Sequence, residues 1–323
     1  MALDGKGFGL SFLDSQENDT TPPPPPPPSL EVLPSQVSSS VKCTVEPVNL
    51  GGLTLLKGRV STKEVFRLPN SDLVPGVYED GTALFILLLL VLYDCTYLKI
   101  HTLLGLGGLK LWEGSLDLVK ALQSEIQNGH ISFTGKRVLE LGCGHGLPGI
   151  FACLEGAAAT HFQDFNAEVL RCLTIPNVNA NISKEFQPGE TKETNSDTGA
   201  EVRFFAGDWS QIHQLLPYVH DNENDLNCSS GLAPTSGYDI ILMAETIYSV
   251  PTHQSLYGLI KKCLSHPQGV VYMAAKKHYF GVGGGTRRFL SMVEKDGIMD
   301  SCLVAEVADG SSNVREVWKL SFK

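Results

Sequence analysis

The strongest constraint on the fold is a short apolar stretch, residues 137–141, that runs directly into a turn rich in glycine. Glycines follow at positions 142, 144, 146 and 149, and apolar residues resume from position 147. A glycine-rich turn after a buried strand lets a ligand approach the backbone, and the next helix offers that ligand free N–H groups. The stretch therefore predicts an α/β fold that binds a ligand at the end of this strand.

Segments of strand and helix character alternate from here to the end of the chain. Strands are expected at residues 137–141, 160–163, 202–206, 238–244 and 269–275, and helices at 117–127, 148–155, 168–173, 254–264 and 287–294. A final antiparallel pair is expected at 302–307 and 314–322. This alternation predicts a mostly parallel sheet with an antiparallel last strand and with helices on both faces.

The first part of the chain lacks this regularity. Residues 1–42 contain an unbroken run of prolines at 22–28, which has no backbone donors with which to join a core, so a disordered arm is expected. Residues 43–79 are expected to form an N-terminal extension with some strand character. The regular α/β domain is expected to occupy residues 108–323.

An apolar block separates the extension from the domain. Residues 83–93 are uninterrupted by any polar side chain except that of Tyr93, and Asp94 ends the run. A helix needs about 20 apolar residues to span a bilayer, and this run is shorter. We therefore expect residues 80–107 to be an insertion or a buried element, and we do not expect a membrane anchor.

Composition excludes some classes of function. The formal net charge is −10, which argues against a direct nucleic-acid binder, because such proteins usually carry a basic face. The eight cysteines include no CxxC pair, so neither a zinc site nor a redox motif is expected, and no metal at all is predicted. The first residues show no secretory signal. We expect a protein of the cytoplasm and nucleus, acting as a monomer.

Acidic residues at successive strand ends identify the ligand class. Glycines 144, 146 and 149 satisfy the dinucleotide pattern GxGxxG, so NAD must be considered. However, Glu140 leads the turn, where it would repel a pyrophosphate and attract a sulfonium or ammonium group. Asp164 ends the second strand, where a carboxylate can accept both ribose hydroxyls; alone, it could equally be a helix cap.

A third strand end carries an acid next to an aromatic ring. The residues are Gly207, Asp208 and Trp209, and they suit adenine, with the carboxylate on its amine and the ring against its face. Together the three strand ends favour S-adenosylmethionine over NAD. Gly142 and Gly144 would then lie in the loop that faces this cofactor.

Several further stretches resemble a known family. They are residues 71–79 (SDLVPGVYE), 108–118 (GLKLWEGSLDL), 161–166 (HFQDFN), 173–178 (LTIPNV), 244–248 (AETIY) and 277–285 (KHYFGVGGG). They resemble the seven-strand S-adenosylmethionine-dependent methyltransferases, and more closely the histidine protein methyltransferases that modify a large-subunit ribosomal protein. The resemblance implies a Rossmann-like, seven-stranded methyltransferase sheet over residues 108–323. In relatives GVYE runs directly into GGLK, which makes residues 80–107 an insertion.

The resemblance also implies cofactor contacts. The residues that would flank the methionine end of S-adenosylmethionine are Leu111, Trp112, Glu113, Gly114 and Ser115. Gln163, Asp164 and Phe165 would hold the ribose and the edge of adenine. Gly207, Asp208 and Trp209 would frame adenine, and Ala244 would line the floor near the transferred methyl group. Without the family, Trp112 could equally be a core tryptophan.

Catalysis is assigned to two residues after the fourth strand. A histidine nucleophile is largely neutral at pH 7, so it needs no strong base, only an acceptor for its second ring N–H. Glu245 and Tyr248 are placed to orient that ring, although Glu245 could instead cap the following loop. Glycines at 281–285 would form either a flexible rim that admits the substrate or a structural hairpin.

Two alternatives remain open from the sequence. One is a lysine protein methyltransferase of the same fold, since an acid and an aromatic residue also suit an ammonium group. The other is a catalytically silent binding protein, because the insertion lies close to Trp112. The expected partner is a protein substrate.

Overall fold

The computed structural model describes residues 28–65, 107–182, 200–219, 237–308 and 313–323. Within these residues, eight strands form one sheet in the order β1-β6-β5-β4-β7-β8-β10-β9. The strands are β1 (Leu30–Val32), β4 (Arg137–Leu141), β5 (Ala159–Asp164), β6 (Glu201–Ala206), β7 (Ile240–Ala244), β8 (Val270–Lys276), β9 (Met299–Ala308) and β10 (Val314–Phe322). A separate hairpin pairs β2 (Cys43–Leu50) with β3 (Leu53–Val60).

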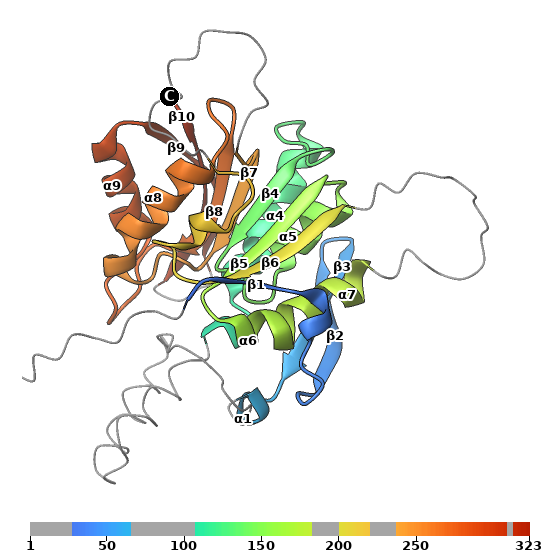
Figure 1. Ribbon diagram of the computed structural model, residues 1–323. Helices are drawn as coiled ribbons and strands as arrows, with labels where there is room; N and C mark the ends of the chain where they lie inside the picture. Colours follow the sequence, from blue (N-terminus) through green and yellow to red (C-terminus); the bar gives the residue numbers. More distant parts are fainter. Residues whose placement is uncertain (1–27, 66–106, 183–199, 220–236, 309–312) are drawn as a thin grey trace, which may run out of the picture.

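The predicted fold class is confirmed. The five central strands β4 to β8 run parallel, and β10 lies antiparallel to both of its neighbours. The main helices are α4 (Glu113–Gln127), α5 (Leu147–Leu154), α6 (Ala167–Val169), α7 (Ile175–Ile182), α8 (His253–Cys263) and α9 (Thr286–Asp296). Figure 1 shows α8 and α9 on one side of the sheet and α4 and α5 on the other. One π-helical turn, Leu170–Thr174, joins α6 to α7.

Each face of the sheet has its own hydrophobic core, because successive side chains of a strand point to opposite faces. In β7, Ile240 and Leu242 pack into the core on the α4 and α5 side. The alternate residues Ile241 and Met243 pack into the core beneath α8 and α9. A strand buried on both faces reads as a continuous apolar run, which is why the central strands could be placed from sequence.

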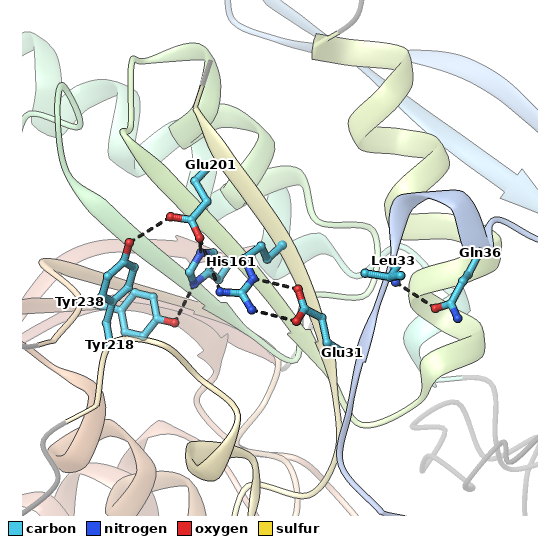
Figure 2. A network of polar contacts seen from close by, with 8 residues as sticks. Glu31, Leu33, Gln36, His161, Glu201, Tyr218 and Tyr238 are labelled. Atoms are coloured by element: carbon cyan, nitrogen blue, oxygen red, sulfur yellow. Dashed lines mark hydrogen bonds and ion pairs between the residues drawn. The ribbon is translucent and has the colours of Figure 1, made fainter. Parts of the chain in front are cut away.

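The prediction of a disordered arm is wrong for residues 28–42. Leu30–Val32 forms β1, which pairs antiparallel with β6 and adds an eighth strand to the expected seven. Val32 is buried, and Glu31 receives two hydrogen bonds of 2.8 Å from the guanidinium of Arg203. Figure 2 shows Glu31 at this edge, near Glu201 and near the buried His161. A paired, ion-bridged strand is ordered even though a proline run precedes it.

Other expectations fall partly outside the described residues. The expected extension contains the hairpin β2–β3 and the single helical turn α1 (Thr62–Val65), and its remainder from residue 66 is not described. The apolar block at 80–107 lies outside apart from Gly107, so the insertion remains a prediction. In the described part of the chain, no helix has the length and apolarity needed to cross a membrane. The described residues also contain no group of three metal-ligating side chains.

Candidate functional site

A pocket of about 330 Å³ opens where the carboxyl ends of β4, β5, β6 and β7 meet. Ligand sites of open α/β sheets lie at this edge, and the volume is within the usual range for a small-molecule site. Many of the predicted residues line it: Trp112, Ser115, Gly142, Gly144, Asp164, Phe165, Asp208, Trp209, Ala244, Glu245 and Tyr248. The structure therefore brings together residues that are up to 136 positions apart in the sequence, Trp112 and Tyr248.

Asp164 closes the glycine loop. Its Oδ2 accepts the N–H of Gly144 at 3.0 Å, and its Oδ1 accepts the N–H of Asn166 at 3.0 Å. Burial raises the pKa of Asp164, and the hydrogen bonds from backbone N–H groups oppose that rise. Each carboxylate oxygen keeps a second lone pair, so this side chain can accept hydrogen bonds from a ligand in the pocket it lines.

The glycine loop needs its glycines at the pocket. Gly142 and Gly144 have φ angles of 60° and 49°, a region that side-chain-bearing residues rarely adopt. A Cβ on Gly142 would also lie 2.7 Å from the methyl carbon of Thr246. Any side chain at these two positions would therefore strain the loop and fill the pocket edge.

The expected role of Glu140 needs correction. Its side chain is 1% exposed, does not line the pocket, and accepts the N–H of Gly149 at 2.8 Å. Burial raises its pKa well above the ordinary value, while the bond from Gly149 opposes the rise. Glu140 thus fastens the end of β4 to the first turn of α5, and its side chain does not face the pocket.

Five other predicted cofactor residues are absent from the lining of this pocket. They are Leu111, Glu113, Gly114, Gln163 and Gly207. Leu111 packs against the core on the α4 and α5 side. A Cβ on Gly114 would lie 2.6 Å from Oε1 of Glu245, so this glycine makes room for that carboxylate. Gln163 bonds two residues that do line the pocket, Gly142 and Trp209, whereas Glu113 is exposed to solvent.

Glu245 holds an unusual position in the pocket. Its backbone φ is 56°, a left-handed conformation that costs a non-glycine residue roughly 1–2 kcal/mol. Its Oε2 accepts a hydrogen bond from the hydroxyl of Tyr279, and its buried Oε1 has no hydrogen-bond partner among the described residues. Burial raises the pKa of Glu245 to about 7, with the bond from Tyr279 acting in the opposite direction. Strained, buried and half-paired acids of this kind occur at functional sites.

Tyr279 is the main site residue that sequence reasoning missed. Its side chain is buried, lines the pocket, and lies with its ring 6.4 Å from that of Tyr248 in an edge-to-face arrangement. It follows β8, and Glu245 follows β7, so adjacent parallel strands bring the two together. No local pattern in the sequence marks Tyr279, because its contact with Glu245 depends on β7 and β8 being neighbours in the sheet.

The glycine segment after Tyr279 is hydrogen-bonded to the segment that follows β7. Gly284 N–H donates to the carbonyl of Tyr248 at 3.1 Å, and Gly285 N–H donates to that of Ile247 at 3.0 Å. A Cβ on Gly284 would lie 2.2 Å from the Tyr248 carbonyl oxygen. The loop therefore holds the segment after β7 against the segment after β8, and with it the two tyrosines.

Trp112 contributes a second indole ring to the pocket. It precedes α4 as the N-cap residue, with the Nζ atom of Lys110 4.4 Å from the centre of its ring. Trp112 and Lys110 both line the pocket, as does Ser115 in the first turn of α4. The pocket thus combines a glycine loop, two indole rings and three carboxylates, of Asp164, Asp208 and Glu245.

The chain was compared with curated proteins, protein-family models and solved structures. The chain is 36% identical over 259 residues to a histidine protein methyltransferase 1 homolog of Dictyostelium discoideum, covering 79% of this chain and 62% of that protein. It is 31% identical over 313 residues to the homolog of Mus musculus, covering 90% of this chain and 74% of that protein. The chain spans about three fifths of the length of the Dictyostelium relative. No protein-family model matches the chain.

Among solved structures, the chain is similar to magnesium protoporphyrin IX methyltransferase of Synechocystis with bound SAM. The TM-score is 0.42 at 10% sequence identity, covering 65% of this chain and 81% of that chain. A likeness at this level carries no argument about the site. The sequence relatives show the family, because one of them, at 31% identity, is matched over most of both chains. The chain belongs to the histidine protein methyltransferase 1 family.

Proposed function

We propose that this chain transfers a methyl group from S-adenosylmethionine to a histidine side chain of a protein substrate. The observation that carries the proposal is the free, buried Oε1 of Glu245 in the same pocket as the glycine loop and Asp164. Membership in the family supports the same reaction.

The residues of the pocket fit the cofactor. Asp164 has lone pairs for ribose hydroxyls, and Trp209 offers a flat ring for adenine, with Asp208 next to it. The Oδ1 of Asp208 is held by the N–H and hydroxyl of Ser210 at 2.8 and 2.5 Å, so its carboxylate is fixed in place. The glycine loop and the first turn of α4 would hold the amino-acid end. When bound, S-adenosylmethionine supplies an electrophilic methyl group on a sulfonium.

Glu245 would orient the nucleophile. A neutral imidazole has one N–H and one lone pair, and an acceptor on the N–H leaves the lone pair free to attack. The unpaired Oε1 of Glu245 is such an acceptor, while Tyr279 fixes the other oxygen. After transfer the ring is an imidazolium, and the carboxylate of Glu245 stabilises its positive charge. Tyr248 lines the same wall and would pack against the ring.

For the substrate, we propose a large-subunit ribosomal protein, met in the cytoplasm or nucleus. The support is the resemblance of the chain to enzymes of that specificity. A net charge of −10 also has the sign that suits a basic partner, since ribosomal proteins bind RNA.

A cofactor titration followed by a transfer assay tests the proposal. S-adenosylhomocysteine should bind the purified chain with a stoichiometry of about one, and labelled S-adenosylmethionine should pass its label to a ribosomal protein fraction. Binding without transfer to any protein would support the silent binding protein instead. Absence of binding would refute the cofactor assignment.

A further inference from the structure

Gln163, in β5, bonds two of the loops at the pocket, the loop after β4 and the loop after β6, and does not line the pocket itself. It lies near the carboxyl end of β5 with a fully buried side chain. Its Oε1 accepts the backbone N–H of Gly142 at 3.3 Å and the indole N–H of Trp209 at 2.9 Å. Its Nε2 donates to the carbonyl of Gly207 at 2.9 Å. One amide thus connects the ends of β4, β5 and β6.

The orientation of this amide is determined by its partners. Two of them, Gly142 and Trp209, bring N–H donors, and the third, Gly207, brings a carbonyl acceptor. A flipped amide would place its NH₂ group against two donors and its oxygen against a carbonyl, so only one orientation satisfies all three partners. A buried amide with every close partner satisfied is a rigid connector.

The consequence reaches the pocket through Trp209. Because its N–H is bonded to Gln163, the indole is held at one edge, and the rest of the ring lines the pocket. The ring also lies close to the glycine loop, with its Cζ2 3.8 Å from where a Cβ on Gly142 would be. The side chain of Gln163 therefore fixes both the glycine loop and the Trp209 ring, which lie close to each other at this side of the pocket.

We propose that Gln163 is a positioning residue that fixes the plane of Trp209 against the glycine loop and so shapes the adenine side of the pocket without touching the ligand. The proposal rests on the proposed function only for the identity of the cofactor. It is independent of whether the methyl acceptor is a histidine or a lysine.

The test is a double-mutant cycle between Gln163 and Trp209. Gln163→Met keeps the length of the side chain but removes all three hydrogen bonds, and Trp209→Phe keeps a ring but removes its N–H. We expect Gln163→Met to weaken S-adenosylhomocysteine binding about tenfold in the wild-type background, and clearly less in the Trp209→Phe background. Equal losses in the two backgrounds, or no loss in either, would overturn the proposal.

A matched control separates positioning from general destabilisation. Asn181 is also a buried amide with three hydrogen bonds. Its Oδ1 accepts the backbone N–H of Leu56 at 2.7 Å, and its Nδ2 donates to the carbonyls of Leu56 at 2.7 Å and Asn177 at 2.8 Å. It does not line the pocket. Asn181→Leu should lower the melting temperature as Gln163→Met does, yet leave the affinity unchanged. An equal loss of affinity in Asn181→Leu would mean that Gln163 acts only through stability.

A second readout needs no ligand and so stands even if the cofactor assignment fails. The chain has three tryptophans, and of these Trp209 donates to Gln163. Gln163→Met should shift the tryptophan emission of the unliganded protein, and the shift should vanish in the Trp209→Phe background. An unchanged emission spectrum in Gln163→Met, or a shift that persists without Trp209, would contradict the proposed link.

Discussion

Tyr279 donates a hydrogen bond to Glu245, and both side chains are buried in the wall of one pocket. The bond occupies Oε2 of the carboxylate and leaves Oε1 without a partner among the described residues. Two strand ends that are adjacent in the sheet thus build a carboxylate with one oxygen fixed and one free. The account of catalysis depends on this pair.

Removing the phenol should impair transfer and leave the cofactor in place. In Tyr279→Phe, the carboxylate of Glu245 loses the one hydrogen bond that it accepts among the described residues, so we expect transfer to fall about tenfold, equivalent to about 1.4 kcal/mol. Affinity for S-adenosylhomocysteine should stay within twofold. Tyr272 is the control. Its hydroxyl donates a hydrogen bond of 2.9 Å to Glu125, and it does not line the pocket. If Tyr272→Phe slows transfer as much, the effect is one of stability.

The raised pKa of Glu245 predicts a pH-dependent stability. The folded-state value of about 7 lies above that of an unfolded glutamate, so the folded protein binds the extra proton between about pH 4 and pH 7. Stability is therefore lost as pH rises through this window, by about 3 kcal/mol at most. Melting curves without substrate should show Glu245→Gln gaining on the wild type from pH 4 to pH 8. If the melting temperatures of the two proteins change with pH in parallel, the pKa of Glu245 is not raised in the folded state.

Asp164 should matter for binding more than for folding. Asp164→Ala removes the acceptor proposed for ribose, together with the bonds from Gly144 and Asn166. We expect affinity for S-adenosylhomocysteine to fall at least tenfold, while the protein remains folded by circular dichroism. If calorimetry gives Asp164→Ala the same affinity as the wild type, Asp164 does not bind the ribose hydroxyls.

The ordered part of the N-terminal arm should stabilise the domain. A chain that begins at Pro28 keeps β1, whereas one that begins at Val41 loses the buried Val32 and the ion pair between Glu31 and Arg203. Burying a valine contributes about 1.5–3 kcal/mol, so the shorter chain should melt about 5 °C lower. Equal melting temperatures for the two chains would show that β1 does not stabilise the domain.

The apolar segment at 80–107 remains a prediction. The described chain resumes at Gly107, and the next residue, Gly108, lines the pocket with its carbonyl oxygen 3.2 Å from where a Cβ on Gly144 would be. Joining Glu79 to Gly108 should raise solubility and strengthen cofactor binding, because it removes the apolar block that precedes Gly108 in the sequence. Weaker binding or lower stability of the shortened chain would make the segment part of the fold.

The central sheet could be predicted because its signals are local. The strand at 137–141 was placed to the residue, since a strand buried on both faces is a continuous apolar run ended by a glycine turn. The start of α4 at Glu113 was placed four residues late, because its N-cap, Trp112, makes no side-chain capping bond that a sequence pattern would reveal. Strand β1 was missed because three residues are too few to show alternation.

The site was predictable where ligand-facing residues follow strand ends, as with Asp164 and Glu245. It was not predictable where one strand-end residue contacts another. The sequence shows that Gln163 and Glu140 stand near the pocket, but only the packing shows that both turn toward backbone N–H groups. The pairing of Tyr279 with Glu245 depends on the order of strands in the sheet, which is a tertiary property.

The measurement that tests the account most directly is the mapping of the methylated residue. Ribosomal proteins are incubated with S-adenosylmethionine and either the wild-type chain or Glu245→Gln, and methyl groups are located by tandem mass spectrometry. The account predicts a methylhistidine in one large-subunit protein with the wild type, and its loss with Glu245→Gln although S-adenosylhomocysteine still binds. Methyl groups on lysine, or no modified residue from a chain that binds the cofactor, would contradict it.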